Sequence, residues 1–218
     1  MTRYWIAMAL LALAVGGLFQ AVARYQIPLL KMAGMIGLLL MGVVGNLALS
    51  HQQTDRGRRR VEAALKALEP DFIITDWAEG RGPAGAPEYL VVGPGGLAAV
   101  VLDPMPQSTW RRRAPKRLAA ARDRARAAAE WVAATGAAAG VSVPPPLPVV
   151  VLTRRLVQPG EEDQGGVLVL NPEHLGDRLR QLAGPERLDP RERVRITRRL
   201  RQAADRQAAA GKGRPGAR

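Results

Sequence analysis

The first fifty residues of the chain carry only three charged side chains, Arg3, Arg24 and Lys31, and none of them is acidic. Residues 4–23 contain no charge, and residues 27–49 contain only Lys31, near their start. A helix of about twenty residues rises roughly 30 Å, which is the thickness of the hydrocarbon core of a bilayer. Each run is therefore long enough to span a membrane, and Lys31 lies close enough to one end to reach the headgroups.

The three residues between the runs leave room only for a tight helical hairpin, so both ends of the hairpin lie on one side of the bilayer. Arg3 precedes the first run, and four arginines follow the second: Arg56, Arg58, Arg59 and Arg60. Basic residues beside membrane spans stay in the cytoplasm. We therefore expect a two-helix protein of the cell membrane whose N- and C-termini are both cytoplasmic.

Other interpretations of this N-terminal part stay open. Arg3, the apolar stretch and residues 21–23 imitate a cleaved signal peptide, in which case the second run is still an anchor. Both runs could instead be helices of a soluble core, although such long apolar runs are uncommon there. Glycines between Gly34 and Gly45 allow helices to approach closely, so a membrane-assembly protein is a further alternative.

Composition narrows the chemistry of the rest of the chain. The protein has 32 Lys+Arg, 19 Asp+Glu and no cysteine, and its two histidines are His51 and His174. This excludes disulfides, thiolate metal sites and a cysteine nucleophile, and leaves little for a zinc centre or a serine triad. Beyond residue 50 the basic side chains exceed the acidic ones by ten, so most of the net charge of +13 belongs there.

The hydrophobic pattern beyond the apolar runs predicts an α/β layered domain. Helical spacing of apolar residues begins near residue 54 and ends at Pro70. Short β-type runs and further helical runs then follow in the order strand 72–77, strand 89–92, strand 97–102, helix 116–135, strand 149–152, strand 167–170, helix 175–182 and helix 190–210. We expect the first three strands to be mostly antiparallel, and the turn GPGG at residues 93–96 to be a hairpin rather than a phosphate loop. The expected organisation is a hairpin over 1–50, an α/β domain over 55–185, a basic helix over 186–210 and a disordered tail over 211–218.

Several segments together resemble one known family. They are the helix at 57–68, the strand, turn and strand YLVVGPGGL at 89–97, the strand GVLVL at 166–170 with the helix after it, and the ending at 188–200. Over roughly residues 55–205 the chain resembles the nuclease-related domain (NERD) family, a branch of the PD-(D/E)xK restriction-endonuclease-like fold, several of whose members carry N-terminal membrane helices. The resemblance implies a restriction-endonuclease-like domain that is preceded here by two transmembrane helices.

The resemblance also implies where catalytic residues would stand. Such nucleases use carboxylates that hold Mg²⁺ and a lysine near the attacking water. The family's helix glutamate falls on Arg58, its aspartate on Glu88, and its Glu-x-Lys motif on residues 101–103, where Val101 and Asp103 replace the glutamate and the lysine. We therefore expect divalent-metal hydrolysis to be lost and no cofactor to be bound.

A rearranged site is the enzymatic alternative. Glu62 lies one helical turn after Arg58, and Asp103 lies two residues after Val101, on the same face of its strand. Glu62, Glu88 and Asp103 would then be the metal-binding and catalytic carboxylates of a Mg²⁺-dependent nuclease.

Basic residues are the remaining clue to function. One cluster, beside Trp110, contains Arg111, Arg112, Arg113, Lys116, Arg117, Arg122, Arg124 and Arg126. Eleven more basic residues follow from Arg187 onward. Such surfaces bind nucleic-acid backbones, with Trp110 as a stacking partner, or anionic lipid headgroups at a membrane. The sequence thus favours a membrane-anchored module that binds nucleic acid, anionic lipid or a protein partner that the sequence does not identify.

Overall fold

The computed structural model describes most of the chain. The described residues are 6, 9–10, 13–14, 16–17, 20, 28–77, 82–105, 114–158, 162–181 and 188–212. The chain divides into two compact units, Met1–Arg56 and Gly57–Arg218, which are considered one at a time.

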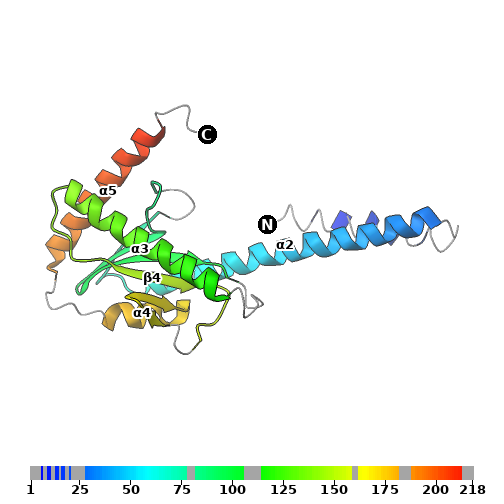
Figure 1. Cartoon of the computed structure of the whole chain (residues 1–218), viewed down its shortest axis with the longest axis horizontal. Helices are drawn as coiled ribbons and strands as arrows, with labels where there is room; N and C mark the ends of the chain where they lie inside the picture. The colour runs from blue at the N-terminus through cyan, green and yellow to red at the C-terminus, as the bar shows by residue number, and fades with distance from the viewer. Residues whose placement is uncertain are drawn as a thin grey trace. The chain divides into compact units, whose positions relative to one another are not determined.

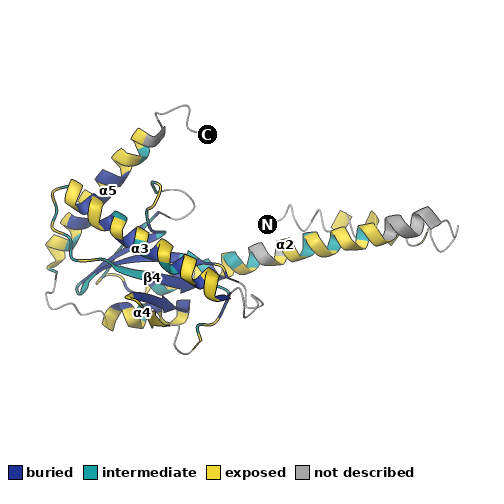
Figure 2. Cartoon of the chain, in the orientation of Figure 1, coloured by how far each residue is buried: buried dark blue, intermediate teal, exposed yellow. Residues whose placement is uncertain are grey.

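One candidate membrane span, which begins in the first unit, occurs among the described residues. It lies in α2 (Pro28–Lys66), which begins at Pro28, a residue suited to a first helical turn. Within α2, the stretch Met35–Lys66 is long and apolar enough to cross a bilayer, by length and composition. Large apolar side chains in the first part of this stretch, for example Met35 and Leu39, are exposed (Figure 2), whereas Val61 and Leu65 near its end are buried.

Two expectations for this part have different outcomes. The described residues provide one candidate span, and most of the other expected span, residues 4–23, lies outside them. The sequence also suggested a new helix after residue 50, whereas α2 continues through that point to Lys66. The reason is that no proline lies between Pro28 and Pro70 to end the helix. Each interior glycine costs a helix only about 1 kcal/mol.

The second unit is built on a six-stranded mixed sheet. Its strands are β1 (Ile73–Asp76), β2 (Tyr89–Gly93), β3 (Gly96–Asp103), β4 (Leu147–Leu152), β5 (Asp163–Gln164) and β6 (Val167–Leu170), in the spatial order β1-β2-β3-β4-β6-β5. Strands β1, β2 and β3 are antiparallel, as expected, while β3, β4 and β6 are parallel. The two-residue β5 pairs with β6 and was not predicted, because so short a strand shows no alternation of apolar residues.

Helices cover both faces of the sheet, so the predicted layered α/β domain is confirmed (Figure 1). Alternate residues of each strand point to opposite faces. In β4, Val150 and Leu152 pack on one face, with α3 (Ala114–Ala138) and α5 (Pro190–Lys212). On the other face, Val149 and Val151 pack with the last turns of α2 and with α4 (Pro172–Gln181). These two faces are called the α3 face and the α4 face below.

Two local contacts fix the positions of neighbouring elements in the second unit. A Cβ on Gly57 of α2 would lie 2.5 Å from the Cβ of Thr153, which directly follows β4, so only glycine fits there. The turn after β2 is a tight hairpin in which Gly93 pairs with Gly96, as predicted. The carbonyl of Pro94 in that turn accepts a 2.9 Å hydrogen bond from the N–H of Leu188, which seats the start of α5.

Candidate functional site

A charged centre lies on the α3 face, where β3 ends. Asp103 is the last residue of β3 and is only 5% exposed. Its Oδ2 accepts a 2.5 Å hydrogen bond from the guanidinium of Arg124, which reaches it from α3. Its Oδ1 is buried and has no hydrogen-bond partner among the described residues. Because an unpaired buried carboxylate is costly, Arg124 is the group that makes this position tolerable.

Glu88 belongs to the same centre. It directly precedes β2, and continuing the register of Tyr89 with Val100 brings Glu88 opposite Val101. Burial raises the pKa of Glu88 above its ordinary value, and the nearby charge of Asp103 adds to that rise. The backbone N–H groups of Glu88 and Leu102 and the charge of Arg124 lower the pKa in part. Arg124 thus bonds Asp103 directly and influences Glu88 through its charge.

The residues of this centre do not fit the divalent ion that the family resemblance implies. Mg²⁺ requires a nearly octahedral shell of oxygen ligands. Val101, where that family has a metal-binding glutamate, is an aliphatic side chain packed in the core and 4% exposed. One oxygen of Asp103 already holds a guanidinium, which repels a second cation. No group of three or more carboxylate or histidine side chains placed to hold a metal occurs in the described parts of the chain.

Glu62 lies elsewhere, on the α4 face. The hydroxyl of Tyr89 donates a 3.3 Å hydrogen bond to its Oε1, and the Nε of Arg58 donates to the same oxygen at 2.8 Å. Arg58 is also 4.0 Å from Asp76 of β1. Glu88 directly precedes β2, and the N–H of Trp77 donates a 2.8 Å hydrogen bond to its carbonyl, which continues the ladder, so Glu88 and Tyr89 point to opposite faces. The structure therefore joins Glu88 with Asp103 but separates both from Glu62, so the three candidates form no single site.

The cluster beside Trp110 is only partly a free basic surface. Arg111, Arg112 and Arg113, with Trp110, lie outside the described residues. Lys116 and Arg117 are exposed in the first turn of α3. The remaining three members make contacts within the protein. Arg124 bonds Asp103, and Arg126 bonds Asp123 at 3.0 Å and the carbonyl of Gly165 at 3.3 Å. Arg122 also has an interaction partner. Sequence counting did not reveal these partners, since Asp103 and Gly165 are distant along the chain.

The helix α5 carries a more open basic face. Its Ile196, Leu200 and Ala204 are buried against the α3 face of the sheet. The opposite side of the helix exposes six arginines, namely Arg191, Arg195, Arg198, Arg199, Arg201 and Arg206, which we call the arginine face. Arg198, Arg199 and Arg201 form no ion pair with any described residue. The sequence predicted a basic helix here, and the structure adds which side of it is free.

Comparison with known proteins does not add a family. No family model, curated protein or solved structure that was compared with the chain matches it. The resemblance to the NERD family therefore stays an expectation from the sequence.

Proposed function

We propose that this chain is a membrane-anchored nucleic-acid-binding protein, in which the arginine face of α5 contacts the phosphate backbone. The observation that carries the proposal is the run of exposed arginines from Arg191 to Arg206. It extends about 22 Å along the helix axis. Duplex DNA carries about thirteen charges over that length. Arginine also binds phosphate oxygens in pairs, which lysine does not.

The packing of α5 favours a nucleic acid over a lipid surface. An amphipathic helix that binds membranes inserts its apolar face among the lipids. The apolar face of α5 is already buried in the domain, through Ile196 and Leu200, and Val194 is its one exposed large apolar side chain among the described residues. Only headgroup charge would then hold the helix on a bilayer.

The finer assignments are part of the same proposal. We infer a NERD-like domain of the restriction-endonuclease-like fold. The observed order, helix, three strands, helix, three strands and two helices, supports this inference, with the short β5 as the one strand that was not expected. The nuclease chemistry of that fold is lost, because Val101 is aliphatic and Asp103 is paired with Arg124. The anchor is a two-helix hairpin with both termini in the cytoplasm, as the arginines that flank the apolar runs favour.

The test uses the full chain in nanodiscs of neutral lipid and measures fluorescence anisotropy of a labelled 24-base-pair duplex against salt. Arg198→Gln combined with Arg199→Gln removes two charges from the arginine face. Arg178→Gln combined with Arg180→Gln is the matched control, because it removes two charges from α4, which covers the α4 face. We expect the first pair to weaken binding about tenfold and to reduce the salt slope by about 2.

Three results would contradict the proposal. One is equal weakening by both double variants, which would mean that net charge alone controls binding. Another is a failure of the duplex, and of a labelled single strand, to bind at low salt. The third is loss of binding when anionic lipid is added to the nanodiscs, which would show that headgroups occupy the arginine face. Metal-dependent cleavage of the duplex by the wild-type chain, removed by Glu88→Ala, would overturn the inactive site.

A further inference from the structure

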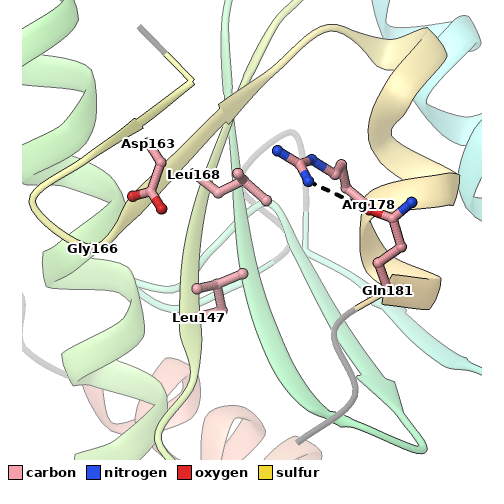
Figure 3. A pocket seen from close by; sticks show the side chains of 6 residues that line it. All are labelled: Leu147, Asp163, Gly166, Leu168, Arg178 and Gln181. Carbon is pink, nitrogen blue, oxygen red and sulfur yellow. Dashed lines mark hydrogen bonds between the residues drawn. The ribbon is translucent and has the colours of Figure 1, made fainter. Parts of the chain in front are cut away.

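A cavity of about 230 Å³ lies on the α4 face, away from the arginine face. It is lined by six residues, which Figure 3 shows as sticks: Leu147, Asp163, Gly166, Leu168, Arg178 and Gln181. Leu147 and Leu168 come from the first residues of two neighbouring parallel strands and form an apolar floor. Arg178 and Gln181 come from the last turn of α4.

The charged groups stand at opposite ends of that floor. Asp163 pairs with Leu168 across the β5–β6 ladder, and paired residues of neighbouring strands point to the same face. Figure 3 shows Asp163 on one side of Leu168 and Arg178 with Gln181 on the other. One end of the cavity thus offers a carboxylate, and the other offers a guanidinium and an amide.

The guanidinium of Arg178 has donors left for a ligand. Within the described residues, it makes a 3.4 Å hydrogen bond to Gln181 and an ion pair with Glu162 at 3.8 Å. Both are long, and an exposed ion pair of that length contributes little stability. A guanidinium has five N–H donors, so a ligand carboxylate can bind it without breaking a strong contact.

We propose that this cavity binds a small ω-amino acid, a molecule whose ammonium and carboxylate groups are separated by a short alkyl chain. The ammonium pairs with Asp163, the carboxylate with Arg178 and Gln181, and the alkyl chain lies on Leu147 and Leu168. At roughly 30 Å³ for each water displaced, the volume suits a ligand of on the order of eight non-hydrogen atoms. This site is independent of the nucleic-acid interface, because none of its residues belongs to α3 or α5.

The probe is 5-aminopentanoate, which has eight non-hydrogen atoms on the scale that the volume suggests. Its affinity for the full chain in detergent is measured by isothermal titration calorimetry. Three compounds are compared with it: pentanoate lacks the ammonium, pentylamine lacks the carboxylate, and norvaline is an isomer whose two charges are adjacent. We expect saturable binding of 5-aminopentanoate and at least about tenfold weaker binding of the other three.

Variants separate the two ends of the cavity. Asp163→Asn is expected to weaken 5-aminopentanoate about tenfold without changing pentanoate, and Arg178→Gln to weaken it similarly without changing pentylamine. Arg180→Gln is the control, since Arg180 is on the same helix but bonds Asp177 and the carbonyl of Ala67. Melting temperatures verify that each variant is folded. No saturable binding in the millimolar range, equal binding of norvaline, or unchanged affinity in both pocket variants would overturn the proposal.

Discussion

Arg124 donates a 2.5 Å hydrogen bond to Asp103 across twenty-one positions of sequence, and so joins the middle of α3 to the end of β3. Asp103 is almost wholly buried, whereas the side chain of Arg124 is 52% exposed. The pair is therefore asymmetric: the carboxylate depends on the guanidinium far more than the reverse.

Removing the cation should destabilise the domain. Arg124→Gln leaves the carboxylate of Asp103 buried and unpaired, and we expect a loss of about 2 kcal/mol, less than for a fully buried pair because water reaches Arg124. Asp103→Asn in the same chain should recover part of that loss, since the amide carries no charge. Thermal unfolding of the four chains of this double-mutant cycle measures the coupling. Additive losses would contradict a direct pairing.

Glu88 predicts a particular dependence of stability on pH. Its pKa is raised in the folded protein, chiefly because burial disfavours the charged form. The folded state then holds its proton more tightly than the unfolded state, so this contribution to stability is complete below the ordinary pKa of 4.5 and is lost as pH rises through the folded value. We expect Glu88→Gln to lack this loss. The melting temperature of the variant should rise relative to that of the wild type as pH increases from 4 toward 7. Parallel plots of melting temperature against pH would contradict the raised pKa of Glu88.

The contact between Gly57 and Thr153 predicts opposite effects of one substitution at two helical glycines. Gly57→Ala places a Cβ within 2.6 Å of the Thr153 carbonyl oxygen, a backbone atom that cannot move aside easily. We expect a net destabilisation of about 1–2 kcal/mol, although alanine is the better helix former. Gly176→Ala in α4 meets no atom closer than 3.8 Å and should stabilise by about 0.5–1 kcal/mol. Thermal unfolding of both variants measures the two changes in stability. A change of the same sign at both positions would contradict this prediction.

The packing of α5 is testable through Leu200. This side chain is wholly buried on the α3 face, and Leu200→Ala should cost about 3 kcal/mol through lost burial and the cavity left behind. Its exposed neighbour Arg199 is the control, since Arg199→Ala should change stability by less than about 0.5 kcal/mol. Hydrogen exchange of α5 amides would rise in the Leu200 variant alone. Equal protection in both variants would mean that α5 is held in another way.

Local patterns predicted most of the elements. The continuous apolar run in β4 ends at Leu152 and the one in β6 ends at Leu170, and both strands appear where expected. The hairpin turn at Gly93 and Gly96 was also readable, because few other residues suit such a turn. The helix start expected near residue 54 was wrong, since a change from apolar to basic side chains does not interrupt the hydrogen bonds of a helix.

The candidate site could be predicted less well from local sequence patterns than the helices and strands. Glu62, Glu88 and Asp103 were grouped by analogy of position, and the structure unites only the last two. The partner of Asp103 was counted among the surface basic residues, because α3 had to be packed on β3 before Arg124 could be seen to reach it. The short strand β5, and with it the carboxylate at one end of the cavity, carried no periodic signal at all.

By itself, the sequence determined the apolar segment that is long enough to span a membrane, the identity of the main strands and helices, and the excess of basic residues beyond residue 50. These properties depend on neighbours within a few turns or a few strand positions, so they can be read locally. Only the tertiary structure decided which arginines are neutralised inside the protein and which are free on α5. The tertiary structure also decided that the side chains of Glu88 and Tyr89, which are adjacent in sequence, contact different partners on opposite faces of the sheet. Those outcomes depend on contacts between segments far apart in the chain, which exist only when the helices pack on the sheet.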